Sequence, residues 1–374
     1  MYFVFLASII AIILTYCESK GKIKAGLKYA FILMTLVSAF RYGYGSDYFG
    51  YILDFKEACS YSIEDYLTFN DTIREPGWWL LMKLFQPLGC YVFFAFLAVV
   101  TSLIIYKFIK ENVVTKDLWI AMSIYLLNFD LYVLQQSMMR QAFAMAIFVS
   151  AFRYIGAINK ALYDSKKKDT LLPDIIKLSL LITLMAFIHQ SSMVVIPIAL
   201  VAFVPLRNGK LLSMFLFAAF CLLWVSSRFV APIFENLMAL DAIAFYGEKY
   251  IDDDSLHFGI RQILSLIPFF VALYYLYDKK TECSNRSLVV ISMMGTLVLP
   301  FAGMMQLIGR VAYYFDIYTI AAYPIVYRHI RATPIRYLLL ALVIFIDVYM
   351  WFDKCKNPTW EGSFLEYHTL FKLL

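Results

Sequence analysis

The stretch YFVFLASIIAIILTY, residues 2–16, contains no charged side chain and is almost wholly apolar. A helical run of about this length covers most of the roughly 30 Å hydrocarbon core of a bilayer. It lacks the basic flank and the small-residue cleavage site that are typical of a secretory signal peptide. We therefore expect these residues to form a retained membrane span.

The rest of the chain has the same character. Of its 374 residues 62% are hydrophobic and only 16% are charged, and the mean hydropathy is +0.71. A soluble domain would carry about 25% charged residues. This composition excludes an ordinary soluble enzyme and predicts an all-α, polytopic integral membrane protein that forms a single transmembrane helical domain over residues 1–374.

About 12 apolar runs are long enough to be treated as membrane spans. They are residues 1–17, 26–40, 91–109, 118–134, 138–158, 174–189, 191–205, 210–226, 259–277, 287–303, 310–328 and 335–352. The stretch 76–88 is apolar but too short to span, so it predicts a re-entrant or interfacial helix.

The distribution of basic residues predicts the orientation of these spans. Six alternate connections, around residues 18–28, 107–117, 153–177, 207–210, 278–286 and 328–336, hold most of the 33 lysines and arginines. The positive-inside rule places such connections in the cytoplasm. Both termini and the long connections 41–90 and 227–258 are then expected on the outer side.

Other site chemistries find little support in the sequence. The six cysteines are scattered and form no CxxC or His–Cys cluster, so neither a zinc site nor a disulfide framework is indicated. The net charge of +6 lies mainly in short loops between spans, which argues against nucleic acid as a partner. We expect no metal and no cofactor.

Five arginines remain on the predicted outer face. Arg140, Arg261 and Arg310 begin helices, while Arg41 ends the second span and Arg74 precedes the short apolar helix. Helix N-termini attract anions, and the guanidinium group suits forked contact with phosphate. The set therefore predicts an outward-facing pocket for a diphosphate, although each arginine alone is also explained by a side chain that reaches the interface.

Two groups are candidates for moving a proton. His189 lies between two apolar helices and precedes Ser191 and Ser192, which are typical helix-capping residues. Its imidazole suits a general base near neutral pH, or a structural cap. Glu75 directly follows Arg74 and is either an acid or base or a local ion-pair partner. No GxSxG motif or Ser-His-Asp spacing is present, so the sequence does not support nucleophilic hydrolysis.

The stretch FRYGYGSDYFGYILDF, residues 40–55, combines charge with aromatic rings. Asp47, Tyr48 and Tyr51 suit a sugar, because rings stack on it and a carboxylate binds its hydroxyls. The tyrosines are equally typical of an interfacial aromatic belt. A single aspartate here argues against a metal site, which would favour paired carboxylates.

Four motifs resemble those of the EpsG family, whose members are polytopic proteins of bacterial polysaccharide gene clusters related to Wzy-type O-antigen polymerases. They are FRYGYGSDYFGY at 40–51, REPGWWLLMKLF at 74–85, MRQAFAMAIF at 139–148 and FIHQSS at 187–192. The matching motifs cover residues 40 to 192, and the C-terminal half is similar mainly in hydropathy.

The resemblance implies a fold similar to the GT-C-like polymerase and ligase architecture, in the bacterial inner membrane. It implies transfer of a growing glycan from undecaprenyl diphosphate to the next lipid-linked repeat unit at the outer face, with a separate chain-length regulator as a partner. Catalytic roles would then fall to His189, Glu75, Arg140 and Arg261. Substrate contacts would fall to Arg41, Asp47, Tyr48, Tyr51, Arg74, Gln141, Gln262 and Arg310. His189 and Glu75 stay open as alternative bases.

Competing functions differ in what they ask of the sequence. An O-antigen-type ligase uses the same donor and would also place arginines outside. A lipid-linked oligosaccharide flippase would line a path to both faces with charge, and a transporter would show symmetrical broken helices. A glycosyltransferase that adds single sugars would favour an acidic pair in the first outer loop. The outer arginine set favours the polymerase.

Overall fold

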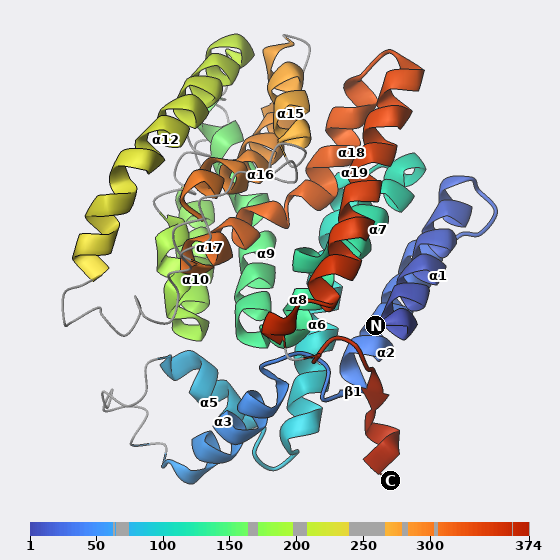
Figure 1. Ribbon diagram of the computed structural model, residues 1–374, viewed down its shortest axis with the longest axis vertical. Helices are drawn as coiled ribbons and strands as arrows, with labels where there is room; N and C mark the ends of the chain where they lie inside the picture. Colours follow the sequence, from blue (N-terminus) through green and yellow to red (C-terminus); the bar gives the residue numbers. More distant parts are fainter. Residues whose placement is uncertain are drawn as a thin grey trace. The chain divides into compact units, whose positions relative to one another are not determined.

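The computed structural model describes residues 1–62, 64, 75–163, 171–196, 208–238, 266–278, 283–302, 306–360 and 362–373. The chain forms two compact units. The first unit contains Met1–Tyr154, Leu172–Met193 and Ile344–Leu374, and the second contains Ile155–Leu171 and Val194–Val343. The predicted all-α class is confirmed, because the described residues are mostly helical (Figure 1).

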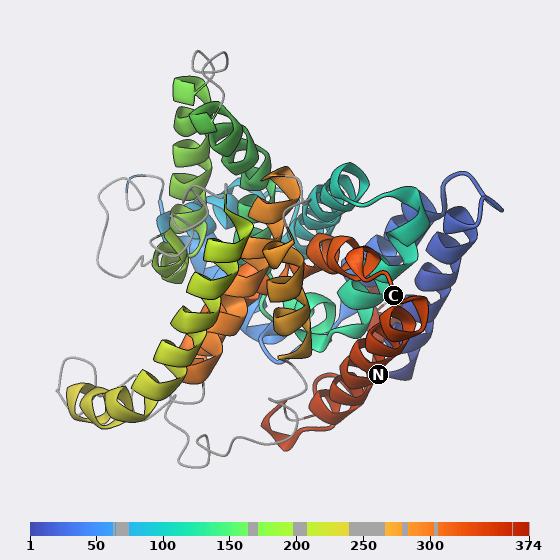
Figure 2. The same cartoon turned by 90° about the horizontal axis from the view of Figure 1, so that it is seen from above.

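The first unit begins with a set of apolar helices that lie side by side. Helix α1 (Tyr2–Ser19) contacts α2 (Gly26–Ala39) and α7 (Leu118–Leu127), and α2 contacts α6 (Cys90–Asn112) (Figures 1 and 2). Helices α1 and α2 approach closely at Gly26, where a Cβ atom would lie 2.0 Å from the carbonyl oxygen of Leu14. Glycine at this position therefore permits the tight packing of the pair.

The predicted span 118–134 is broken in the structure. After η1 (Thr115–Asp117) and α7, the π-helix η2 (Phe129–Val133) and helix α8 (Leu134–Ser137) continue at a bend of 75°. Asn128 at the bend accepts a hydrogen bond from the amide of Asp130, and its own side-chain amide donates to Asp347. Helix α9 (Met139–Tyr163) follows directly. Because Asn128 caps the second piece, the backbone turns there although the hydropathy stays high.

The segment after α2 and the C-terminal segment are held together. Strand β1 (Arg41–Tyr42) pairs antiparallel with β2 (His368–Thr369), so that Arg41 lies opposite Thr369. The α-amino group of Met1 donates to the carbonyl of Leu365. Helices α3 (Tyr48–Ser60) and α5 (Pro76–Leu84) pack against each other. The short 3₁₀ helices η6 (Pro358–Trp360) and η7 (Leu370–Leu373) flank this C-terminal segment.

Two further elements complete the part of the first unit that carries the candidate site. They are α10 (Leu171–Ile188) and the 3₁₀ helix η4 (Gln190–Val194). The expected short helix at 76–88 is present as α5, which has nine residues and is too short to span a bilayer.

The second unit is built from α12 (Gly209–Met238), α15 (Ile267–Tyr277), α16 (Cys283–Ala302), α17 (Gln306–Asp316) and α18 (Thr319–His329). Helix α19 (Thr333–Cys355) begins in this unit and ends in the first. The predicted span 310–328 is wrong as a single helix, since α17 and α18 divide it. The outer connection expected from residue 227 begins too early, because α12 continues to Met238; the rest of that connection lies outside the described residues.

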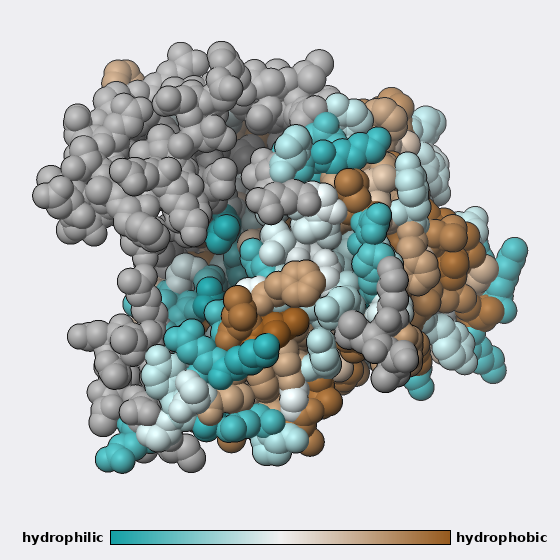
Figure 3. All heavy atoms as spheres, turned by 60° about the horizontal axis from the view of Figure 1, so that its bottom comes forward, coloured by the Kyte–Doolittle hydropathy of each residue, from teal (hydrophilic) through white to brown (hydrophobic). Residues whose placement is uncertain are grey.

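Six helices in the described part of the chain are long and apolar enough to cross a membrane, and the bent pair 115–137 would be a seventh. They are Tyr2–Ser19, Cys90–Asn112, Met139–Leu162, Leu171–Ile188, Gly209–Ser227 and Thr333–Cys355. Apolar side chains gather where α1 lies, at the right of Figure 3, and exposed Phe3, Leu6 and Ile10 contribute to this surface. The chain is therefore a membrane protein, while the count of 12 spans and the GT-C-like architecture stay predictions.

Candidate functional site

Glu75 is placed by the first turn of α5. It is the N-cap residue of this helix, and Pro76 follows at the first helical position, where its fixed φ favours a helix start. A Cβ atom on Gly77 would lie 2.9 Å from backbone atoms of Phe187, so the first turn of α5 lies directly against the end of α10. Glycine at this position brings the Glu75 carboxylate beside the residue that follows α10.

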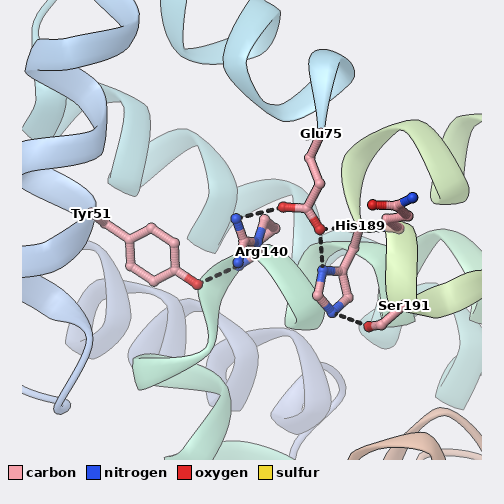
Figure 4. A network of polar contacts seen from close by, with 6 residues as sticks. Tyr51, Glu75, Arg140, His189 and Ser191 are labelled. Atoms are coloured by element: carbon pink, nitrogen blue, oxygen red, sulfur yellow. Dashed lines mark hydrogen bonds and ion pairs between the residues drawn. The ribbon is translucent and has the colours of Figure 1, made fainter. Parts of the chain in front are cut away.

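That residue is His189, between α10 and η4. Its backbone amide donates to the carbonyl of Met185, and its carbonyl accepts from the amide of Ser192. The imidazole Nδ1 lies 2.8 Å from Oε1 of Glu75, and Nε2 lies 2.6 Å from Oγ of Ser191 (Figure 4). The amide of Gln190 also donates to Oε1 of Glu75, at 3.0 Å. The ring is therefore oriented by a contact at each nitrogen.

Arg140, in the first turn of α9, contacts the other oxygen of the same carboxylate. Its Nη1 lies 2.5 Å from Oε2 of Glu75, and its backbone amide donates to the hydroxyl of Tyr51 at 3.4 Å (Figure 4). The side chain of Arg140 is 31% exposed, yet its Nε is buried without a hydrogen-bond partner. One carboxylate thus holds an imidazole and a guanidinium, and the guanidinium keeps unused donor capacity.

The electrostatics of the network follow from these contacts. Burial alone would raise the pKa of the Glu75 carboxyl, but the hydrogen bond from His189 and the charge of Arg140 outweigh it and lower the pKa below its usual value. Glu75 is therefore ionised near neutral pH and accepts a proton-bearing Nδ1 from His189. Nε2 of a neutral imidazole then accepts the hydrogen bond from Ser191.

Helix α3 borders this network with two titratable side chains. Tyr51 is buried, its ring packs edge-on against Trp78 at 5.7 Å, and burial raises the pKa of its hydroxyl to about 12. Burial also raises the pKa of the half-buried Asp54, on which the charges of Arg140 and Glu75 act. Tyr51 therefore stays protonated and positions the start of α9.

The structure holds Arg41 and Tyr48 inside the segment that carries them. Arg41 is 4% exposed and donates to the carbonyls of Ser38 and Gln136, and the Tyr48 hydroxyl donates to the carbonyl of Arg41. These are contacts that fix a backbone. Asp47 is exposed, and its amide donates to the hydroxyl of Ser137 just before α9. The substrate contacts of all three stay predictions.

A cavity adjoins Arg41 inside the first unit. Gln135, Gln136, Tyr132 and Thr101 contribute to its lining together with Arg41. Nε of Arg41 and Nε2 of Gln135 are both buried without a hydrogen-bond partner. Gln135 was not singled out in the sequence, because a glutamine inside an apolar helix carries no recognisable motif.

The remaining predicted site residues are spread over the chain. Gln141 is 3% exposed, one residue after Arg140, and half-buried Arg310 belongs to α17 of the second unit. Arg74, Arg261 and Gln262 lie outside the described residues. Among the residues that the structure describes, no group of three or more His, Cys, Asp or Glu side chains is placed to hold a metal ion.

The structure brings together Glu75, Arg140 and His189, three residues that lie far apart in the sequence. It adds Ser191, which the sequence indicated only as a helix cap. The spacing His189–Gln190–Ser191 is the one signal for it, since a tight turn places residues two apart near each other.

Comparison with protein families gives one match. The model of the EpsG family matches residues 27–369, nearly the whole chain, which confirms the resemblance carried by the four sequence motifs. Comparison with the curated proteins and with the solved structures finds no match.

Proposed function

The chain belongs to the EpsG family, and on that premise we propose that it joins lipid-linked oligosaccharide repeat units at the outer face of the membrane. Membership indicates a polysaccharide polymerase of exopolysaccharide biosynthesis. The finer proposal is that the growing glycan leaves undecaprenyl diphosphate and joins a hydroxyl of the next lipid-linked unit. Residues 27–369 contain the whole Glu75–Arg140–His189 network, so the family match covers the candidate site.

The observation that carries the proposal is the shared carboxylate of Glu75. Glycosyl transfer to a hydroxyl needs a base for the acceptor proton and a cation for the leaving group. Glu75 orients both candidates, His189 through Nδ1 and Arg140 through Nη1. This arrangement favours His189 as the base, with Glu75 stabilising the imidazolium that forms. It resolves the alternative that the sequence left open.

The charge of the network sets a requirement on the leaving group. The positive charge of Arg140 is already balanced by Glu75, so Arg140 alone does not offset the charge of a diphosphate. We propose that Arg140 contacts one phosphoryl oxygen through its unused donors, and that Arg74, Arg261 and Arg310 supply further positive charge. This makes the reaction independent of a metal ion.

Sugar and lipid contacts complete the proposal. Asp47, exposed at the start of α3, is placed to bind sugar hydroxyls, with Gln141 and Gln262 as further candidates, and Tyr51 acts mainly by positioning the start of α9. Tyr48 and Arg41 are proposed to hold the segment that carries Asp47. The lipid tail would lie along apolar helices, and a chain-length regulator would bind elsewhere on the protein.

The function is tested by deleting the gene in its host and resolving surface and lipid-linked glycans on a gel. We expect the ladder of lengths to collapse to a single repeat and the wild-type gene to restore it. Long polymer that persists on its lipid carrier would instead identify a ligase and contradict the proposal. An unchanged ladder would contradict both functions.

The role of Arg140 is tested in the same strain with Arg140→Ala. Its matched control is Arg153→Ala, because Arg153 lies on the same helix, is exposed and contacts only the neighbouring Tyr154 in the printed sequence order. We expect Arg153→Ala to restore the ladder and Arg140→Ala to fail. A full ladder with Arg140→Ala would remove this residue from the mechanism.

A further inference from the structure

The Ser191 hydroxyl covers the nitrogen of His189 that the proposed reaction needs. Nδ1 of His189 is occupied by Glu75, so only Nε2 is available to accept a proton. Oγ of Ser191 lies 2.6 Å from this Nε2, a short hydrogen bond (Figure 4). An acceptor sugar that approaches Nε2 therefore meets a hydroxyl of the protein first.

The chain fixes Ser191 in this position. It lies in the 3₁₀ turn of η4, whose start is closed by the hydrogen bond from the Ser192 amide to the His189 carbonyl. Ser192 is fully buried and anchors the turn, whereas Ser191 is only half-buried. The side chain of His189 is 14% exposed, with Glu75 on one nitrogen and Ser191 on the other. The hydroxyl of Ser191 is thus the accessible end of the line Glu75–His189–Ser191.

We propose that Ser191 is a catalytic residue that contacts the acceptor hydroxyl and relays its proton to His189. The inference rests on the proposed glycosyl transfer and adds a residue to that site. Its chemistry is that of a hydroxyl placed between a sugar hydroxyl and an imidazole, both of which exchange protons by hydrogen bonding.

The step balances as follows in atoms and charge. The acceptor oxygen attacks the anomeric carbon and forms the new glycosidic bond, while the bond from that carbon to the diphosphate oxygen breaks. The acceptor proton passes to Oγ of Ser191, and the serine proton passes to Nε2 of His189. The diphosphate leaves with the bonding electron pair, and Glu75 stabilises the imidazolium until it loses its proton to water.

The test uses the purified full-length protein and the lipid-linked repeat unit extracted from the deletion strain. Initial rates are measured against acceptor concentration and pH for wild type, Ser191→Ala, Ser191→Thr and Ser192→Ala. Ser192→Ala is the matched control, because Oγ of Ser192 is buried without a hydrogen-bond partner and lies one residue away in the same turn.

We expect Ser191→Ala to lower kcat about 100-fold, the usual contribution of a group that transfers a proton, with KM for the donor unchanged. Ser191→Thr, which keeps a hydroxyl, should recover most of the rate, and Ser192→Ala should match wild type. A solvent deuterium effect from two moving protons in wild type should fall to that of one in Ser191→Ala, which a purely structural role of Ser191 does not explain.

Two results would overturn the relay. A Ser191→Ala rate equal to that of Ser192→Ala would mean that Ser191 merely covers Nε2 in the empty site. A glycan attached to Ser191, detected by mass spectrometry, would make it a nucleophile. If His189→Ala is inactive while Ser191→Ala is fully active, the relay fails and the proposed function stands; full activity of His189→Ala removes the proposed base as well.

Discussion

At the scale of single residues, Glu75 is the centre of the site because it serves two partners at once. Replacing Glu75 with Gln keeps an oxygen for Nδ1 of His189 but turns an amide toward Arg140, where two donors then oppose each other. We expect at least a 100-fold loss of polymer formation. The rate of repeat transfer measures it, and exposed Glu57→Gln on α3 serves as the control. Activity near wild type in Glu75→Gln would show that the carboxylate has no part in the reaction.

The same residue predicts a pH dependence of stability. The pKa of Glu75 is lower in the folded protein than its ordinary value of 4.5, so its stabilising effect is fully present above that value. The effect is lost as the pH falls through the lower folded pKa. We expect the difference in melting temperature between wild type and Glu75→Gln to be largest above about pH 5 and to shrink in more acidic buffer. A difference that grows on acidification would contradict the assigned direction.

The sequence singled out Glu75, Arg140 and His189 correctly as neighbours of a site, because charged and imidazole groups stand out against apolar helices. It did not separate the two base candidates, since that depends on which atom faces which partner. Ser191 was missed in its present role because its contact with His189 exists only in the turn after α10. Arg41 and Tyr48 look functional in the sequence and are held by backbone contacts in the structure.

At the scale of elements, the site depends on the close approach of α5 and α10. An alanine at Gly77 would bring Cβ to 2.9 Å from the backbone of Phe187, so one helix must shift. We expect Gly77→Ala to destabilise the protein by about 1–3 kcal/mol and to reduce activity, since Glu75 moves away from His189. Thermal unfolding and the rate of repeat transfer measure the two effects.

The matched control for this change is Gly50→Ala in α3. Nothing lies within 4 Å of a Cβ atom there, and alanine in a helix is favoured over glycine. We expect unchanged activity and equal or slightly raised stability for Gly50→Ala. Equal behaviour of Gly77→Ala and Gly50→Ala would mean that the α5–α10 contact does not place the carboxylate.

Element boundaries are also where sequence and structure differ most. Hydropathy is an average over a window, and it does not register a break at which the chain stays apolar. The bend at Asn128 and the turn at Ile317 between α17 and α18 both fall within continuous apolar runs. The signals for these breaks are local, a capping asparagine in one case and a polar Asp316 beside Gly295 in the other.

At the scale of the whole molecule, composition alone predicted the class, because a chain so poor in charge has no other way to bury its apolar surface. The predicted orientation is not decided by the helices themselves. It follows from lysines and arginines in loops, several of which lie outside the described residues. The contact of Met1 with Leu365 and the pairing of β1 with β2 do place both termini beside the same segment, residues 40–45.

This arrangement predicts that the two termini lie on one side of the membrane. A reporter that is active only outside the cytoplasm, fused in turn to each end of the full chain, should be active at both. A third fusion within the basic connection 18–28 should be inactive and is the control. Activity at one terminus only would contradict an even number of spans, and activity at neither would reverse the orientation.

The central claim is that this chain forms polymer through a base held by Glu75, and reconstitution tests it most directly. Purified protein in lipid vesicles is supplied with the lipid-linked repeat unit from the deletion strain, and product length is read on a gel. The account predicts a ladder with wild type and with His368→Ala, an exposed histidine paired with Glu366, and a single repeat with His189→Ala. A ladder formed by His189→Ala, or none formed by wild type, would contradict it.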